Sequence, residues 1–375
     1  MRISFLGLRS IGEGSGGVER HVHELATRMA RQGHQVNVFC RGRYQTETVH
    51  CPGLRVIPKP TLYTKHLEAI SHTGAALPGA IRRADVVHFQ ALGPSLLSWV
   101  PRLARTRSVV TIHGLDYQRA KWNALARNVL RMGAWTALHC PHATIAVSRP
   151  LCRTFEEMFG KAPTYIPNGI SRPERRPLER LRRFGLEDSG YLLFLGRLVP
   201  EKGCHLLIQA FRDLDTDRKL LICGDASHTG EYVARLRELA RDDPRIVFTG
   251  PVYGAEKDEA FSNAGLFVLP SDLEGMPIVL LEAMSYGCPV LASDIDAVLD
   301  TFDPDPHQAR EQLRGHFGFH FRAGQVQDLR TRLEAALGHP DLRNMGRRAR
   351  DMALQAYDWD AITAQTLEVY RSVLK

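Results

Sequence analysis

Two cations stand close together in the second half of the chain, where they could hold a phosphorylated ligand. Arg197 and Lys202 lie five residues apart, after the apolar run 191–195 and beside Gly196, which lets a ligand approach the backbone closely. A guanidinium offers a planar fork to phosphate oxygens, and an ammonium offers a compact charge. The pair therefore suits a diphosphate; the alternative is two solvated surface cations.

Two glutamates follow further along the chain, eight residues apart. Glu274 lies in a loop that ends at Pro277, a residue suited to a first helical turn, so backbone amides near the helix start would form an anion site. Glu282 lies inside the apolar stretch 278–284, where an unpaired charge is costly. We expect Glu282 to have a partner, for which ribose hydroxyls qualify; the alternative is two unrelated surface carboxylates.

A glycine-rich loop stands near the start of the chain. Gly12, Gly14 and Gly17 match GxGxxG, and Gly16 with Gly17 would let amides at a helix start approach a phosphate or sugar. A dinucleotide fold would carry an acidic residue after its second strand, but this chain has Arg41 there. Arg41 could suit a 2′-phosphate, so an NADP-dependent oxidoreductase stays open, as does a turn without a ligand.

An Asp-x-Asp pattern, Asp294 and Asp296, follows a later apolar run. Two carboxylates there could hold Mg²⁺ or Mn²⁺ and neutralise a diphosphate. The pattern lies late in the chain, and Arg197 with Lys202 already supplies positive charge. We therefore expect two loop carboxylates and no metal requirement.

Short apolar runs alternate with amphipathic stretches along the whole chain, which predicts parallel strands joined by crossover helices. After a Pro- and Arg-rich segment, 171–183, which we interpret as a linker, a second alternating set begins. We expect two Rossmann-like α/β halves with doubly wound parallel sheets facing a cleft. The predicted strands are 3–8, 36–40, 85–89, 108–112 and 143–148, then 191–195, 219–223, 245–248, 266–269 and 289–292.

The composition is that of a globular protein, with 375 residues, 44% hydrophobic and 24% charged. No run approaches the roughly 18 apolar residues of a membrane span, and no export signal is visible. The 7 cysteines are scattered without a CxxC pair. We expect a cytoplasmic protein without a disulfide framework or a zinc site.

Charge is distributed unevenly. Residues 1–170 contain 22 Lys and Arg against 9 Asp and Glu, whereas the remainder contains 27 against 32. A basic half attracts anionic lipids, phosphorylated substrates or nucleic acid. Nucleic acid is disfavoured because the cations are not interleaved with aromatic residues in a known module.

Together these motifs resemble a retaining glycosyltransferase of family 4, with the GT-B fold. The matching segments span most of the chain in the order of the family: Gly16-Gly17-Val18-Glu19, His113-Gly114, Gly196-Arg197 with Lys202-Gly203, and Glu274 to Glu282 followed by Tyr286-Gly287-Cys288-Pro289-Val290. Asp294 to Val298 departs from the pattern, because it lacks the small turn with glycine that usually follows that strand.

The resemblance implies a role for each matching residue. Arg197 and Lys202 would hold the donor diphosphate, Glu274 would accept hydrogen bonds from donor-sugar hydroxyls, and Glu282 would hold the ribose. His113 is similar to the histidine near the reacting sugar on the acceptor side. The implied donor lining is Gly16, Gly17, Gly196, Val252, Gly275, Met276 and Pro277, and the implied acceptor residues are His113, Asp116, Arg119 and Lys121.

The resemblance also implies an acceptor-side domain over 1–170, a nucleotide-sugar domain over 171–355 and a helix over 356–375 that crosses back to the first. The implied reaction moves a hexosyl group, with retention, from a nucleoside diphosphate sugar to a hydroxyl of a glycan or polyprenyl-diphosphate-linked acceptor in cell-surface glycan biosynthesis. The enzyme could lie peripherally at the inner face of the plasma membrane, since 118–138 combines cations with apolar side chains. A nucleotide-sugar-binding protein without turnover stays open.

Overall fold

The computed structural model describes residues 1–12, 16–45, 49–64, 67–118, 124–225, 230–303 and 315–375. The chain divides into two compact units. The first unit contains Met1–Gly169 together with Trp359–Lys375, and the second contains Ile170–Asp358. Among the described helices, none combines the length and the apolar character needed to cross a bilayer.

The first unit is built on a parallel sheet of seven described strands in the order β3-β2-β1-β4-β5-β6-β7. The order reverses between β1 and β4, and ligands bind open parallel sheets at such a point, beyond the carboxyl ends of the strands. The strands are β1 (Arg2–Leu6), β2 (Gln35–Arg41), β3 (Leu54–Lys59), β4 (Val86–Gln90), β5 (Arg107–Ile112), β6 (Ala143–Ala146) and β7 (Thr164–Tyr165).

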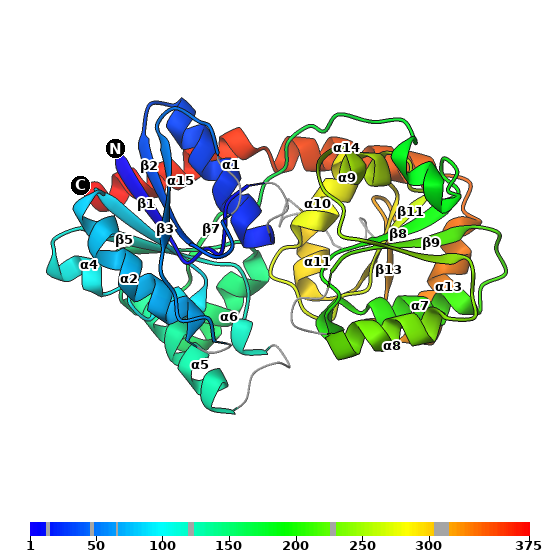
Figure 1. Cartoon of the computed structure of the whole chain (residues 1–375), viewed down its shortest axis with the longest axis horizontal. Coiled ribbons are helices and arrows are strands. Elements are labelled where there is room, and N and C mark those ends of the chain that lie inside the picture. Colours follow the sequence, from blue (N-terminus) through cyan, green and yellow to red (C-terminus); the bar gives the residue numbers. More distant parts are fainter. Residues whose placement is uncertain (13–15, 46–48, 65–66, 119–123, 226–229, 304–314) are drawn as a thin grey trace. The chain divides into compact units, whose positions relative to one another are not determined.

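Helices cover both faces of this sheet (Figure 1). Ile3 and Phe5 of β1 face α1 and α15, and Trp359 and Tyr370 of α15 are fully buried in the same core. Ser4 points to the other face, where its hydroxyl donates to the carbonyl of Ala80 in α2 at 3.2 Å. The helices are α1 (Gly17–Arg31), α2 (Glu68–Arg82), α3 (Leu92–Ser95), α4 (Val100–Leu103), α5 (Ala124–His139), α6 (Arg149–Phe159) and α15 (Trp359–Leu374), with a 3-10 turn η1 (Asp116–Gln118).

The second unit repeats the plan with six described strands in the order β10-β9-β8-β11-β12-β13, again all parallel. Its reversal point lies between β8 and β11. The strands are β8 (Tyr191–Leu195), β9 (Lys219–Cys223), β10 (Ile246–Gly250), β11 (Leu266–Leu269), β12 (Val290–Ser293) and β13 (Phe319–Phe321).

Alternate residues of β8, such as Leu192 and Phe194, pack with α7, α8 and α13 into one core. Helices α9, α10 and α14 lie on the other side of the sheet (Figure 1). The helices are α7 (Cys204–Arg212), α8 (Gly230–Ala240), α9 (Gly254–Ser262), α10 (Ile278–Ser285), α11 (Asp296–Thr301), α13 (Val326–Leu337) and α14 (Leu342–Ala356), with 3-10 turns η2 (Arg180–Phe184) and η3 (Pro200–Lys202).

The segment 171–183 is not a free linker, so that interpretation is wrong. Leu178 and Leu181 are buried in the second unit. The carboxylate of Glu259, itself only 3% exposed, accepts hydrogen bonds from the amides of Glu179, Arg180 and Leu181 at 2.7, 3.1 and 2.7 Å. Three backbone donors and two leucines thus anchor a segment whose Pro and Arg content had indicated exposure.

The loop at Asp294 to Val298, which departs from the family pattern, forms a regular helix start. Ile295 caps α11, and its carbonyl accepts the amide of Val298 at 2.9 Å. A carboxylate oxygen of Asp294 accepts the amide of Ala323 at 2.9 Å. Asp294 therefore fastens the loop after β12 to the loop after β13.

Candidate functional site

The second unit gathers its predicted donor residues at the carboxyl edge of the sheet, at the reversal point. Arg197 and Lys202 lie in the loop after β8, and Glu274 lies in the loop after the neighbouring β11. A backbone hydrogen bond from Asp272 to the carbonyl of Glu201, 2.9 Å long, joins the two loops. Strand order thus brings together residues that are far apart in the sequence.

Lys202 and Glu274 form an ion pair, in which the ammonium donates to Oε1 of the carboxylate. The two side chains are 16% and 9% exposed, so the pair is shielded from much of the solvent. Arg197 is exposed nearby along the same loop. The edge therefore carries one guanidinium in the same loop as a partly buried ammonium, which is paired with a carboxylate, a set that can bind a diphosphate and a hydroxyl.

Gly203 explains why the two loops can approach so closely. Its φ is +67°, and a Cβ built there would lie 1.9 Å from the carbonyl oxygen of Pro270. Any side chain at this position would push apart the loops that carry Lys202 and Glu274. The glycine after the lysine is therefore part of what positions the ion pair.

Glu282 has a protein partner that the sequence analysis missed. The ammonium of Lys257 in α9 donates to Oε1 of Glu282 in α10 at 2.9 Å, and both side chains are about one-fifth exposed. Val252, at the loop before α9, is 5% exposed, and Met276 is 6% exposed. Gly275 and Pro277 are buried beside Met276. Of the predicted donor lining in this unit, Gly196, Arg197, Lys202, Glu274 and Glu282 are thus the residues that are not fully buried.

Metal ligands do not gather in the described part of the chain. No group of three or more His, Cys, Asp or Glu side chains is arranged there to hold an ion. Asp294 is engaged with Ala323, and Asp296 lies in the first turn of α11, where a carboxylate favours the helix.

In the first unit, His113 follows β5 and joins a group of buried polar side chains. Its Nε2 donates to Oε1 of Gln90, at the end of β4, over 2.7 Å. The rings of His113 and His21 meet edge to face with centroids 4.8 Å apart. His21, from α1, donates through Nδ1 to Oδ1 of Asn168 at 2.9 Å. Three elements and the chain segment after β7 therefore meet around His113.

Burial controls the protonation of these histidines. It lowers the pKa of His21 to about 4, against a smaller opposing effect of the hydrogen bond to Asn168. Burial, with the neighbouring His21, holds the pKa of His113 well below its ordinary value. Each imidazole is therefore neutral near pH 7. With Nε2 of His113 donating to Gln90, its second ring nitrogen is an acceptor that can orient a hydroxyl.

The glycine loop leads into α1, which begins at Gly17 with Gly16 as its N-terminal cap. Glu19, in the first turn, accepts the amide of Arg9 at 3.3 Å. This fixes the chain after β1 against the helix start. Gly14 lies outside the described residues, so of the GxGxxG glycines only Gly12 and Gly17 are described.

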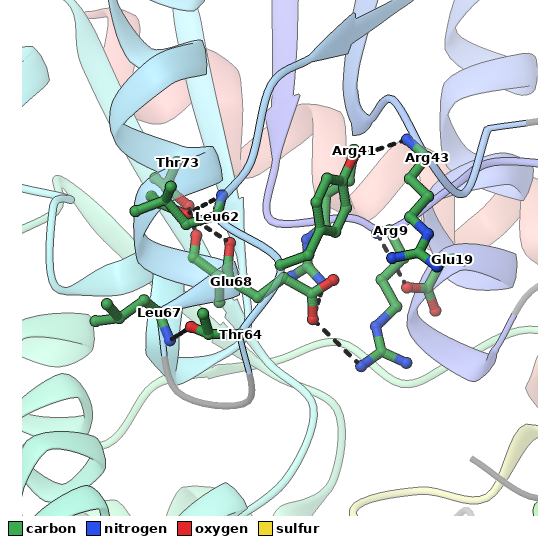
Figure 2. Close-up of polar contacts among 12 residues, drawn as sticks. Arg9, Glu19, Arg41, Arg43, Leu62, Thr64, Leu67, Glu68 and Thr73 are labelled. Carbon is green, nitrogen blue, oxygen red and sulfur yellow. Dashed lines mark hydrogen bonds and ion pairs between the residues drawn. The ribbon is translucent and has the colours of Figure 1, made fainter. Parts of the chain in front are cut away.

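Arg41 is engaged within the protein rather than presented to a ligand. It is 5% exposed, and its guanidinium lies 3.2 Å from the carboxylate of Glu68, which Arg9 also approaches at 3.6 Å. Figure 2 shows this arrangement, with the Glu68 carboxylate between the two arginines. A 2′-phosphate would have to displace Glu68 from a buried ion pair, which argues against a dinucleotide here.

The predicted acceptor residues are only partly described. Asp116 opens the 3-10 turn η1 soon after His113. Arg119 and Lys121 lie outside the described residues. The sequence analysis missed His21, Gln90 and Asn168; the polar residues that end β4 and the Pro-Asn-Gly sequence around Asn168 were the available signals.

Comparison with known proteins gives consistent results over the whole chain. The family model described as Glycosyltransferase Family 4 matches residues 15–172, and the one described as Glycosyl transferases group 1 matches residues 179–352. A phosphatidyl-myo-inositol mannosyltransferase of Mycobacterium leprae is 30% identical over 96% of this chain and 93% of its own length. An alpha-maltose-1-phosphate synthase of Mycobacterium tuberculosis is 26% identical over the full length of both proteins.

Solved structures show the same fold. Sucrose-phosphate synthase from Thermosynechococcus elongatus superposes with a TM-score of 0.81 and 21% identity, over 99% of this chain and 98% of that one. HepE from Anabaena, solved in complex with UDP-glucose, gives a TM-score of 0.80 at 20% identity, over 99% and 100%.

These matches confirm the resemblance and the predicted fold class, and they rule out the oxidoreductase alternative. Both halves of the chain match models of sugar-transferring enzymes, and each half has the parallel sheet that the motifs require. The chain therefore belongs to glycosyltransferase family 4 and is a glycosyltransferase with the GT-B fold.

Proposed function

We propose that this enzyme moves a hexosyl group from a nucleoside diphosphate sugar to a hydroxyl of a lipid-linked or polysaccharide acceptor, with retention of configuration, in cell-surface glycan biosynthesis. The observation that carries the proposal is the Lys202–Glu274 ion pair, in the loop that also carries Arg197, at the reversal point of the second sheet. The UDP-glucose complex of HepE, a protein of the same fold, supports a nucleotide-sugar donor.

In this proposal the cations act on the departing diphosphate. Negative charge grows on the phosphate as the glycosidic bond breaks, so Arg197 and Lys202 bind the transition state more tightly than the ground state. Each contributes roughly 10²-fold in rate. Since two cations neutralise the diphosphate, the reaction needs no metal ion, and activity persists in the presence of a chelator.

Glu274 orients the donor sugar. In the ligand-free enzyme its carboxylate is held by Lys202, and the second carboxylate oxygen and the remaining lone pairs can accept sugar hydroxyls. When the diphosphate binds, the Lys202 ammonium turns toward the phosphate. The ion pair thus keeps both side chains near their working positions before the donor arrives.

The acceptor hydroxyl attacks the sugar from the same face that the phosphate leaves. The departing phosphate helps to remove the proton of the acceptor hydroxyl.

His113 positions the reacting groups in the first unit. It is a neutral imidazole with one nitrogen committed to Gln90. The other nitrogen accepts a hydrogen bond from a hydroxyl of the sugar or acceptor. A neutral ring also avoids placing a positive charge where an oxocarbenium-like centre develops.

The surface of α5 supports a membrane-associated acceptor. Leu125, Val129, Met132 and Trp135 are 74%, 38%, 55% and 50% exposed. They recur every three or four residues, so they share one face of the helix. Arg127 and Arg131 are exposed beside them. An apolar stripe on a helix that also carries exposed cations suits a peripheral site on an anionic membrane, at the inner face of the plasma membrane.

A donor screen with an acceptor extract tests the proposed reaction. Release of nucleoside diphosphate from one of a panel of nucleotide sugars, dependent on the extract and insensitive to chelator, is expected. A protein that binds a nucleotide sugar but never releases the diphosphate would instead be a binding protein without turnover. The anomeric configuration of the product, read by NMR, tests retention.

Membrane association is tested separately by co-sedimentation with vesicles that contain phosphatidylglycerol. Leu125→Glu with Met132→Glu should abolish sedimentation. Leu103→Glu, at a 77% exposed leucine of α4, is the matched control and should sediment like the wild type. Equal sedimentation of all three proteins would contradict the proposal that α5 binds the membrane.

A further inference from the structure

The second unit contains a cavity at the edge of its sheet opposite the donor loops. Its volume is about 230 Å³. Ser189, Arg218, Gly265 and Pro289 line it, and they immediately precede β8, β9, β11 and β12. The cavity therefore lies at the amino ends of the strands, whereas Lys202 and Glu274 lie beyond the carboxyl ends.

Arginines dominate this cavity, which we call the arginine pocket. Five guanidinium groups line it, and Asp188 is the one carboxylate among the lining residues. The five are Arg175, Arg218, Arg343, Arg347 and Arg350. Such an excess of one charge creates a positive potential that attracts anions.

Backbone carbonyls, rather than carboxylates, hold two of the arginines. Arg175 donates to the carbonyl of Ser262 at 2.8 Å, and Arg218 donates to the carbonyl of Ser189. A carbonyl fixes the direction of a guanidinium but does not neutralise its charge. Among the described residues, Arg350 has a carboxylate partner, Asp351, at 2.9 Å. Two of the five guanidinium groups are therefore oriented by neutral acceptors, which leave their charge uncompensated.

Helix α14 supplies the other side of the pocket. Arg343, Arg347 and Arg350 recur at helical spacing on one face. Arg343 lies in the first turn, where positive charge opposes the helix dipole, although the N-cap residue Asp341 supplies one carboxylate, which pairs with Arg348 at 2.8 Å. A bound anion would pair with the arginines that Asp341 does not reach.

The helix is held tightly in place beside the pocket. A Cβ built on Gly346 would lie 2.4 Å from the carbonyl oxygen of Gly287, so only glycine lets α14 approach the turn after α10 this closely. The Tyr286–Pro289 turn itself lines the pocket. The backbone of α14 is thus held closely against this turn, while the side chains of Arg343 and Arg347 are exposed.

We propose that the arginine pocket binds the phosphate group of a small phosphorylated molecule, separately from the donor. Arginine forks match the geometry of phosphate oxygens. The volume is below the roughly 300–1,000 Å³ of pockets for drug-sized ligands, which favours a small anion. Phe261 and Tyr286 in the lining are 1% and 5% exposed, so they offer no face on which a nucleobase could stack.

Equilibrium dialysis with radiolabelled orthophosphate, at fixed ionic strength, tests the proposal. Wild-type enzyme is compared with Arg343→Ala/Arg347→Ala, whose arginines are both exposed, so the fold is preserved. The matched control, Arg235→Ala/Arg332→Ala, removes two exposed arginines of the same unit outside the pocket. Lys202→Ala reports any phosphate held at the donor site. Circular dichroism checks that each variant is folded.

We expect one phosphate to bind wild type, control and Lys202→Ala with the same affinity, and at least ten-fold weaker binding to Arg343→Ala/Arg347→Ala. Equal affinity in all four proteins, or no binding to the wild type, would overturn the proposal. The proposal would also be overturned if the wild-type protein bound a single-stranded oligonucleotide but not orthophosphate. Because Lys202→Ala retains the pocket, failure here is distinct from failure of the proposed sugar transfer.

Co-sedimentation with vesicles distinguishes a phosphate of a lipid headgroup from that of a soluble ester. They contain phosphatidic acid, and the protein carries Leu125→Glu and Met132→Glu so that α5 does not bind them. Sedimentation that is lost with Arg343→Ala/Arg347→Ala would assign the phosphate to a lipid headgroup. Phosphate binding without such sedimentation would assign it to a soluble phosphate ester.

Discussion

Lys257 and Glu282 pair across two helices of the second unit, with Nζ of the lysine 2.9 Å from Oε1 of the glutamate. The lysine satisfies the charge that the apolar surroundings of Glu282 require, and it leaves the second carboxylate oxygen for a ligand. If that oxygen holds the donor ribose, Glu282→Gln should raise the donor KM about ten-fold, because a neutral acceptor binds a hydroxyl less strongly. The value of kcat should change less than about two-fold. Steady-state kinetics with varied donor measure this, and an unchanged KM would contradict the ribose assignment.

Removal of the partners in the Lys202–Glu274 pair should affect kcat. Lys202→Ala should lower it about 10²-fold, because the ammonium stabilises charge that develops on the leaving diphosphate. Glu274→Gln should lower it by a comparable factor through loss of sugar orientation. Both proteins should remain folded by circular dichroism. Arg332→Ala, which changes charge in the same unit away from this edge, serves as the control and should turn over at the wild-type rate.

Gly203 should not tolerate a side chain. Gly203→Ala places a methyl group against the carbonyl of Pro270 and forces an alanine to a φ of +67°, so the loops of Lys202 and Glu274 must separate. Loss of both stability and turnover is expected, with a lower Tm by thermal unfolding. Gly74→Ala is the contrasting substitution, since no atom lies within 4 Å of its built Cβ and the residue is inside α2. Its Tm should stay the same or rise.

Acid should weaken the first unit through its buried histidines. The pKa of His21 is lowered to about 4, so between pH 6.5 and 4 the unfolded chain binds a proton that the folded protein does not. Stability is therefore lost as the pH falls through this window. One such histidine accounts for roughly 2 kcal/mol between pH 7 and pH 5.

Urea unfolding at pH 7 and pH 5 measures this effect, and His21→Gln should reduce the difference. An identical pH dependence in the variant would show that other groups are responsible. Burial acts to raise the pKa of Asp85, but hydrogen bonds from Arg2 and its charge together lower it below the ordinary value, so Asp85 does not titrate between pH 7 and pH 5.

Glu259 should be among the most costly residues to remove from the second unit. Glu259→Ala leaves three backbone amides near Leu181 without their acceptor, which should reduce the free energy of unfolding by about 3 kcal/mol. Glu256→Ala, on the same helix, breaks only the ion pair with the exposed Arg183 and should cost less than about 1 kcal/mol. Equal effects of the two substitutions in chemical denaturation would contradict the anchoring role.

The strands that the sequence predicts best are buried on both faces. Tyr191–Leu195, Lys219–Cys223 and Leu266–Leu269 are found with the predicted bounds, because a central parallel strand reads as a continuous apolar run. Leu54–Lys59 was missed since it is an edge strand, where Pro58 and charged residues are tolerated. Phe319–Phe321 was missed because three residues carry too little pattern.

The contacts within the candidate sites were harder to predict from the sequence than the residues that form those sites. Lys202 and Glu274 were each expected near the donor, but their pairing joins residues 72 positions apart and depends on the order of the strands. Asn168 meets His21 across 147 positions, for which no local spacing is informative. Only the spacing of Arg343, Arg347 and Arg350 on one helix could have been read directly, whereas Arg175 and Arg218 join them through the fold.

Helix α15 has a consequence for how the protein is made. Trp359 and Tyr370 fill the core of the first unit, yet the ribosome synthesises them after every residue of the second. Until then His88 lacks the tyrosine hydroxyl that lies 2.6 Å from its Nδ1, and the apolar face of α1 lacks its cover. The first unit to emerge is thus the last to be completed, and a nascent chain must keep it open while its neighbour is translated.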